Sequence, residues 1–142
     1  MILAIRLPAE AAAFAPNARY LKVRDRTSFA FATAAAAAAL RIKDGLIAEA
    51  RLALGAVAAK PWRVAEAEAL LAGCAPDQAL FDRAAEAAMA GATPSGGNAG
   101  KIDLTRRTAA RVLAMAADGT PARMPALPAS AFGTQAGEHV HF

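Results

Sequence analysis

Residues able to bind a charged or aromatic partner gather in one stretch of this sequence, residues 20–32. If the stretch is an extended strand, successive side chains alternate between two faces, and one face then carries Tyr20, Lys22, Arg24 and Arg26. A face on which an aromatic ring precedes a row of cations suits an anionic or aromatic partner. A solvated sheet face beside acidic neighbours would show the same composition, so the stretch by itself leaves both interpretations open.

The candidates for metal binding or nucleophilic catalysis are isolated residues. His139 and His141 lie near the carboxy terminus without a third ligand at a defined spacing, so they do not form a metal-site pattern. Cys74 has no histidine at a motif spacing and is better explained as a small, partly buried side chain than as a nucleophile. Because it is the single cysteine, it also excludes an internal disulfide and a cysteine-ligated iron–sulfur cluster in this chain. We therefore predict no metal site.

The candidates for phosphate binding or acid–base catalysis are equally incomplete. Ser95–Asn98 precedes Lys101 and a predicted helix, but no strand leads into this segment, so we interpret it as a flexible loop. Glu66 and Glu68 are too close on a predicted helix to share a face, and their side chains diverge. Trp62 would either anchor an interface or fix the chain where a strand passes to a helix. No set of residues composes a self-sufficient active site, and we predict no catalytic residue.

The length and composition indicate one domain that binds neither nucleic acid nor a membrane. The 142 residues suffice for a core, although many of the 56% hydrophobic residues are alanine. The net charge of +4 is spread along the chain instead of forming one basic block, which does not favour nucleic acid. No run reaches the ~20 apolar residues that span a bilayer. We expect a reducing, cytoplasmic setting.

The first half of the sequence has the pattern of strands. Residues 1–8 predict a strand that ends at its proline, and residues 9–18 predict a connecting loop. Residues 29–42 contain an alanine run that suits a helix, but the turn residues at 43–45 favour a strand that pairs with the next one. Residues 46–54 alternate as a half-buried strand does. Its expected buried face carries Leu46, Ala48, Ala50, Leu52 and Leu54.

The second half has the pattern of helices. Residues 64–72 predict a helix that ends at Gly73, and Asp77 is a suitable cap for a helix that runs to about residue 90. A third helix covers roughly residues 103–117. Strands first and helices later favour an α+β fold in which the helices pack on the sheet.

The predicted domain spans residues 1–117, and residues 118–142 form an irregular tail rich in proline and alanine. Residues 92–100 predict a flexible loop before the last helix.

The order of several segments resembles one known family, the carboxy-terminal domain of the FAD-binding (medium) subunit of molybdenum hydroxylases. This family includes xanthine dehydrogenases, carbon monoxide dehydrogenases and aldehyde oxidoreductases, and the sequence is most similar to the bacterial aldehyde oxidoreductase type. The resemblance covers about residues 1–117. The segments that carry it are Tyr20–Arg26, Ser28–Ala32, Asp44–Ile47, Ala53–Arg63, Ala65–Glu66, Gly97–Ala99, Lys101–Leu104 and Arg106–Thr108.

The resemblance implies a fold and a set of partners. The fold is an antiparallel sheet of three to four strands packed against about three helices. In such enzymes a large subunit holds the molybdenum cofactor, a small subunit holds iron–sulfur clusters, and the medium subunit binds FAD mainly through an amino-terminal domain with glycine-rich loops. Those loops are not found in this sequence, so we expect FAD to be shared with a missing amino-terminal domain and the isolated chain to be inactive.

The resemblance also assigns roles to the residues of the cationic stretch. Lys22 matches a position close to the flavin ring, where a cation would stabilise negative charge on the reduced ring. Tyr20 and Arg24 would border the ring or its access channel. We therefore expect Lys22, Tyr20 and Arg24 to be the cofactor-binding residues.

The sequence departs from the family pattern at two places, and other interpretations stay open. Ala56 stands where the family usually has a second glycine, and Gly100 stands where it has a bulky residue. The alternative function is a non-catalytic module that docks to the molybdenum subunit through Trp62 and the helices without binding FAD. The compartment would be periplasmic instead of cytoplasmic if a signal-bearing partner carried the folded complex across a membrane.

Overall fold

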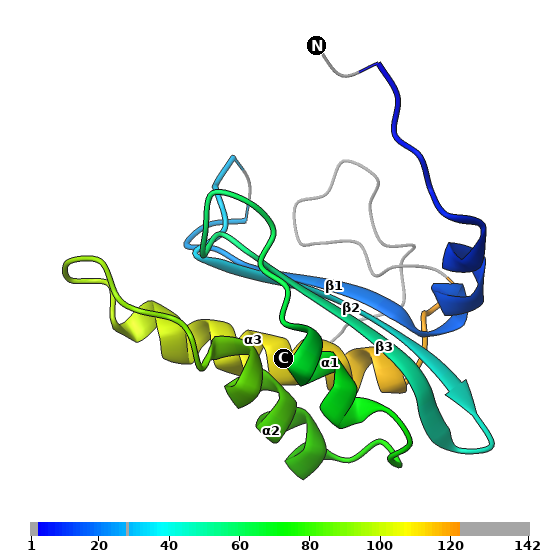
Figure 1. Ribbon diagram of the computed structural model, residues 1–142. Helices are drawn as coiled ribbons and strands as arrows, with labels where there is room; N and C mark the ends of the chain where they lie inside the picture. Colours follow the sequence, from blue (N-terminus) through cyan, green and yellow to red (C-terminus); the bar gives the residue numbers. More distant parts are fainter. Residues whose placement is uncertain (1–2, 28, 123–142) are drawn as a thin grey trace, which may run out of the picture.

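The computed structural model describes residues 3–27 and 29–122. An antiparallel sheet of three strands, in the order β1-β2-β3, has its α-helices packed on one face, which is the predicted α+β architecture (Figure 1). A short 3-10 helix, η1, precedes the first strand. In chain order the elements are η1 (Ala9–Asn17), β1 (Ala18–Val23), β2 (Ala34–Lys43), β3 (Leu46–Gly55), α1 (Ala65–Leu71), α2 (Gln78–Met89) and α3 (Gly100–Ala117).

The alanine run forms strand β2, as predicted, although alanine is the best helix former. The strand is favoured because β1 and β3 pair with it on both sides. Ala36 and Ala38 on its core face are buried under α3, which contributes the buried Ala109 and Leu113. Small side chains on both elements let the helix backbone approach the sheet closely.

A tight turn and a bulge define the β2–β3 hairpin. Asp44 and Gly45 both have positive φ, 53° and 76°, as a two-residue type I′ turn requires, and this confirms the predicted turn. Next to the turn, Ala48 has no partner in β2, because the pairing shifts by one residue there. Between the bulge and the turn, the extra residue reverses which side chains of β3 point to the core. Ile47 is therefore buried and Leu46 is exposed.

The bulge corrects part of the predicted face of this strand. The prediction that Leu46 and Ala48 belong to the buried face is wrong. The rest of that face is buried as predicted: Ala50, Leu52 and Leu54.

The helix ends follow the predicted cap residues. Gly73 follows α1 with φ of 78°, a conformation that favours glycine, and its amide donates to the carbonyl of Ile47 at 2.8 Å. The carboxylate of Asp77 accepts a hydrogen bond from the amide of Leu80 at 2.8 Å at the start of α2. The last helix, α3, begins at Gly100, earlier than predicted, and ends at residue 117 as predicted.

Three predictions for the amino-terminal part are wrong. Residues 3–8 form no strand, because no other part of the described chain pairs with them. Residues 9–17 form η1 instead of a loop, with Phe14 buried against the rest of the molecule. Strand β1 ends at Val23, and the described residues of the connection to β2, 24–27 and 29–33, are irregular. The predictions for His139 and His141, and for the tail beyond residue 122, fall outside the described residues.

Candidate functional site

The face of the sheet opposite the α-helices, here called the open sheet face, carries two of the residues singled out from the sequence. Leu21 of β1 packs against the core, so its neighbours Tyr20 and Lys22 point to the other side. Beside them the open sheet face is made of small residues. The rows across the three strands are Tyr20–Ala37–Ala53 and Lys22–Ala35–Gly55. Ala35 is buried, so the accessible small residues of this face beside the exposed Tyr20 ring are Ala37 and Ala53.

Arg24 and Arg26 do not continue this row. Strand β1 ends at Val23, so the alternation that grouped them with Lys22 stops before they are reached. The structure therefore brings together Tyr20 and Lys22 on one strand face but places Arg24 in the irregular connection, where it is half-buried.

Two cations of this stretch hold the β1–β2 connection in shape. The ammonium of Lys22 donates to the carbonyl oxygen of Ala30 at 2.7 Å. The guanidinium of Arg26 donates to the carbonyl oxygen of Phe29. Because an ammonium has three N–H donors, Lys22 keeps donors for a further partner. Its first role within this chain is to position the connection.

The same connection presents two phenyl rings that sequence reasoning assigned to a strand. Phe29 is 95% exposed and Phe31 is 100% exposed. Phe29 also has φ of 47°, an uncommon conformation for a bulky side chain. The signal that could have separated them from a strand is the polar run Asp25–Thr27, which interrupts the apolar pattern and is typical of a turn.

A shallow, mainly apolar hollow lies on the open sheet face over Ala37 and Ala53, between Tyr20 and the side chains of Arg51 and Arg63. Arg51, which alternates with the buried Ala50 and Leu52 of β3, was given no role from the sequence. A hollow with an apolar floor and guanidinium groups at its border is suited to a flat, anionic or aromatic group.

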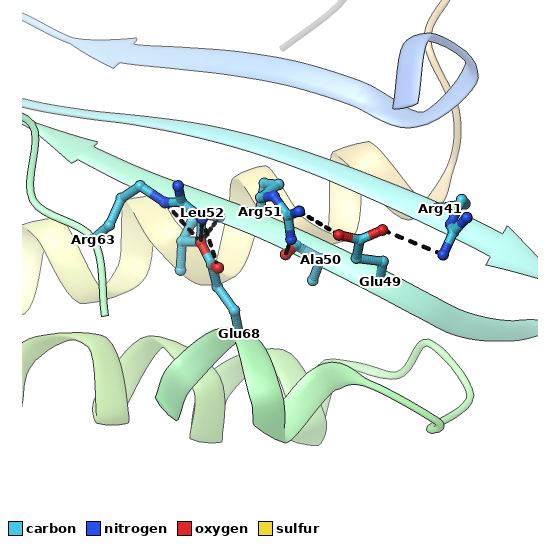
Figure 2. Close-up of polar contacts among 7 residues, drawn as sticks. All are labelled: Arg41, Glu49, Ala50, Arg51, Leu52, Arg63 and Glu68. Atoms are coloured by element: carbon cyan, nitrogen blue, oxygen red, sulfur yellow. Dashed lines mark hydrogen bonds and ion pairs between the residues drawn. The ribbon is translucent and has the colours of Figure 1, made fainter. Parts of the chain in front are cut away.

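Arg51 is held in place from two sides. Its guanidinium pairs with Glu49, and Glu49 also pairs with Arg41 at 3.2 Å (Figure 2). The guanidinium carbon of Arg51 lies 5.4 Å from the centre of the Phe14 ring, within the range of a cation–π contact. The helix η1 thus supports the border of the hollow.

Glu68 joins helix α1 to the sheet and is not part of an acid–base pair. Its carboxylate accepts from the backbone amide of Leu52 at 2.8 Å and forms a two-oxygen pair with Arg63, with contacts of 2.7 Å (Figure 2). Glu66 is exposed and makes none of these contacts, which confirms that the two carboxylates diverge.

Trp62 fixes the chain between the sheet and α1, one of its two predicted roles. Its backbone pairs with Leu54, and its indole N–H donates to the carbonyl oxygen of Ala88 at 2.9 Å. The indole therefore contacts the end of α2 within this chain. A small cavity of about 190 Å³ beside it is lined by Met89, Ile102 and Lys101, among others.

The remaining sequence candidates do not form a site among the described residues. Cys74 is half-buried, and its thiol donates to the carbonyl of Leu70, with an Sγ–O distance of 3.8 Å. The side-chain carbonyl of Asn98 accepts from the amide of Ser95 at 2.8 Å, which closes the loop on itself. In the part of the chain that the structure describes, no group of His, Cys, Asp and Glu has the arrangement of a metal site. Within residues 3–27 and 29–122, no helix combines the length and apolar character needed to cross a membrane.

Residues 19–120 match the family described as the CO dehydrogenase flavoprotein C-terminal domain. The chain belongs to this family. The resemblance inferred from the ordered motifs is thereby confirmed. A curated relative is the aldehyde oxidoreductase FAD-binding subunit PaoB of Escherichia coli (strain K12), which is 44% identical over 97 residues, 68% of this chain and 27% of the relative.

Solved structures of a quinoline oxidoreductase and of a carbon monoxide dehydrogenase contain the same fold. Quinoline 2-oxidoreductase from Pseudomonas putida 86 superposes with a TM-score of 0.68 at 29% identity, over 73% of this chain and 38% of the solved chain. A carbon monoxide dehydrogenase from Hydrogenophaga pseudoflava, in a form without the Mo-pyranopterin moiety of the molybdenum cofactor, gives a TM-score of 0.65 at 30% identity, over 72% and 37%. The chain thus spans about a quarter of its curated relative and less than two fifths of these solved chains.

Proposed function

We propose that this chain is the carboxy-terminal part of the FAD subunit of a molybdenum-containing oxidoreductase of the aldehyde or xanthine type. In this role its open sheet face would border the flavin, and other surfaces would contact the partner subunits. The observation that carries the proposal is the 44% identity to the FAD-binding subunit of an aldehyde oxidoreductase, within the family match of residues 19–120. The chain would need an FAD-binding domain, a large subunit with the molybdenum cofactor and a small subunit with iron–sulfur clusters.

The described residues fit a bordering role better than the role of holding the whole cofactor. Tyr20 offers an exposed ring beside the small residues Ala37 and Ala53, which suits one side of a planar ring system. The half-buried Lys22 adds an ammonium on the same strand face. The glycine-containing loop 95–99 follows helix α2, not a strand, and closes on itself through Asn98, so it does not resemble a pyrophosphate-binding loop. When bound, FAD would accept the electrons, and this chain would contribute a surface of suitable shape and charge beside the flavin ring. Arg24, half-buried beyond the end of β1, would reach the cofactor only at the border of this face.

A chimera tests the proposal. The aligned region of the Escherichia coli relative is replaced by the corresponding residues of this chain, and flavin content and aldehyde oxidation are measured. We expect the chimera to keep the flavin content of the parent, since the two sequences are 44% identical over this region. A chimera that assembles with its partner subunits but lacks flavin would contradict the proposal and favour the alternative, a docking module without FAD.

Lys22→Met in the same chimera tests the role of the cation. If the ammonium stabilises negative charge on the flavin, its removal should lower the flavin reduction potential and slow reduction of the flavin. Lys43→Met is the matched control, because Lys43 lies at the hairpin turn, at the other end of β2 from Ala35, the partner of Lys22. Unchanged flavin potential and kinetics in Lys22→Met would rule out the proposed role.

A further inference from the structure

The cavity beside Trp62 combines apolar walls with hydrogen-bond donors, and the proposed function does not use it. It measures about 190 Å³ and lies where the β3–α1 connection, the α2–α3 connection and the first turn of α3 come together. None of the ten residues that line it is acidic. The cavity therefore suits a ligand that is partly apolar and carries no positive charge.

One wall of the cavity is an indole ring whose position is fixed without a ligand. The backbone of Trp62 exchanges two hydrogen bonds with Leu54, at 2.8 and 2.9 Å, and its indole N–H donates to the carbonyl oxygen of Ala88 at 2.9 Å. Met89 is buried, and Ile102 packs against the same core. Because these side chains are already ordered, a flat apolar ligand would pack against them at little cost in conformational entropy.

The end of α2 brings carbonyl groups to this region, but these acceptors are already engaged. The carbonyl oxygen of Ala88 accepts from the indole of Trp62. The carbonyl oxygen of Met89 accepts from the amide of Ala92 at 2.9 Å. The negative end of the helix dipole is therefore covered by hydrogen bonds within the chain, and it does not set the charge of the cavity.

Lys101 brings a cation to the cavity. It is half-buried in the first turn of α3, and within residues 3–27 and 29–122 its ammonium has no hydrogen-bond or ion-pair partner. The acidic residue of that turn, Asp103, is instead paired with Arg106 and Arg107, at 2.8 and 2.7 Å. Because a cation in the first turn faces the positive end of the helix dipole, Lys101 opposes the stability of the helix. An anion bound beside it would be attracted by both charges.

Asn98 is oriented so that its side chain can donate to the same anion. Its side-chain carbonyl accepts from the backbone amide of Ser95 at 2.8 Å, which leaves the NH₂ group with two donors. Asn98 and Lys101 both line the cavity. Together they offer an amide and an ammonium to one anionic group, and a carboxylate has two oxygens that can accept from them.

We propose that this cavity binds a small aromatic carboxylate of the size of benzoate, with its ring against Trp62 and its carboxylate at Lys101 and Asn98. An apolar cavity of about 150 Å³ holds one benzene ring. The cavity of about 190 Å³ therefore accommodates a ring that carries a carboxylate. Oxidation of an aldehyde yields a carboxylate, so the product class of the proposed reaction includes such molecules.

The test is a titration of the purified chain with sodium benzoate, followed by NMR through the indole N–H signal of Trp62, the single tryptophan of the sequence. We expect a saturable shift of this signal with a Kd between roughly 10 μM and 1 mM, as for a ligand of this size. Intermolecular NOEs should connect the benzoate ring to the indole. Benzyl alcohol has the ring without the charge, and acetate has the charge without the ring, so each should bind at least about tenfold more weakly.

Variants of Lys101 test the recognition of the carboxylate. Lys101→Met should weaken benzoate binding at least about tenfold, because it removes a charge-assisted hydrogen bond. Lys101→Arg keeps the charge and should stay within about threefold of the wild type. The matched control is Lys60→Met, since Lys60 is exposed in the β3–α1 connection and does not line the cavity. All three variants should keep the melting temperature of the wild type.

Three results would overturn the inference. They are an indole signal that does not shift below about 10 mM benzoate, equal binding of benzoate and either control ligand, and equal binding of benzoate by Lys101→Met and the wild type. Because the titration involves neither flavin nor a partner subunit, each of these results would leave the proposed function standing. Loss of flavin from the chimera would in turn leave this inference standing.

Discussion

Lys22 makes a contact within the chain, to the carbonyl of Ala30, that limits how its ammonium can serve a cofactor. The alternation along β1 correctly predicts that Lys22 lies beside Tyr20, opposite Leu21. It does not predict that the ammonium donates to the carbonyl of Ala30, because that contact depends on where the connection to β2 places Ala30. A flavin-facing role for Lys22, which stays a proposal, must therefore use the donors that Ala30 leaves free.

Ala56 carries backbone strain that a single substitution should relieve. It has φ of 64°, in the left-handed region that disfavours a side chain. Ala56→Gly should raise the free energy of unfolding by about 0.5–1 kcal/mol, the left-handed cost for alanine less the unfolded-state entropy of glycine. Chemical denaturation measures this. Ala58→Gly, also exposed but with ordinary φ, should instead lower stability slightly, and a gain in Ala58→Gly equal to that in Ala56→Gly would refute the explanation.

Asp103 gives α3 a pH-dependent contribution. The hydrogen bond from Arg106, with the charge of Arg107 adding to it, lowers the pKa of the Asp103 carboxyl below its ordinary 3.8. Because the folded-state pKa is lowered, the stabilisation is present above the unfolded-state pKa and is lost as the pH falls through the folded-state pKa. The stability difference between wild type and Asp103→Asn should therefore shrink as the pH is lowered through this range.

Carboxyl NMR titration checks the cause of the shift in Asp103 directly. Arg106→Gln should move the pKa of Asp103 up toward 3.8, and Arg107→Gln should move it less, since the Arg106 hydrogen bond is the larger cause. Added salt should reduce both effects because the groups are at the surface. A pKa that is unchanged in Arg106→Gln would show that the ion pair does not exist in solution.

At the scale of elements, local signals predicted the parts of the fold in which neighbours in sequence are also neighbours in space. The Asp44–Gly45 turn, the Asp77 cap and the Gly73 end of α1 each depend on a few adjacent residues, and each is confirmed. The strand conformation of the alanine run followed from that turn, since a hairpin needs a second strand. The bulge at Ala48 was missed because no glycine or proline marks it, and only pairing with β2 reveals it.

The candidate site was less predictable than the elements because it depends on where strands stop. The period-two pattern of the sequence continues past Val23, but the strand ends there. The pairing of β1 with β2 ends at Val23 and Ala34, and the chain leaves the sheet between them. The hollow beside Arg51 also could not be predicted from the sequence. Its floor is formed by residues of different strands, Ala37 and Ala53, which come together only in the folded sheet.

Glu68 is the polar connection between α1 and the edge strand β3, and its removal should loosen that contact. Its side chain is 11% exposed, and it accepts from the amide of the buried Leu52 as well as pairing with Arg63. Glu68→Ala leaves that amide without a partner and should cost about 2–3 kcal/mol, whereas Glu68→Gln, which can still accept from Leu52, should cost about 1 kcal/mol. Glu66→Gln is the control and should change stability by less than about 0.5 kcal/mol. Equal losses in Glu68→Gln and Glu68→Ala would show that the charge pair with Arg63, not the Leu52 amide, dominates.

At the scale of the whole molecule, the two ends of the described fold are joined beside the edge of the sheet. The side chain of Asn17 donates to the carbonyl of Ala116 at 2.8 Å, and the amide of Thr120 donates to the carbonyl of Pro16 at 2.7 Å. The hydroxyl of Thr120 both accepts from and donates to Ala18. These contacts link residues about a hundred positions apart in the sequence, and they hold the segment before β1 against the end of α3.

This closure predicts that an exposed residue beyond the last helix stabilises the start of the first strand. Thr120→Val keeps the shape but removes the hydroxyl, so it should lower the free energy of unfolding by about 1 kcal/mol. It should also speed hydrogen exchange of the Ala18 amide, which loses its acceptor. Thr120→Ser keeps the hydroxyl and should stay close to wild type in both measurements.

The contacts of Asn17 and Thr120 should be coupled, because both hold the start of β1 against the end of α3. Asn17→Ala should therefore lower the free energy of unfolding less in the Thr120→Val background than it does in the wild type. Strictly additive losses would mean that the ends are held independently. In that case removing one contact would leave the other to keep β1 in place.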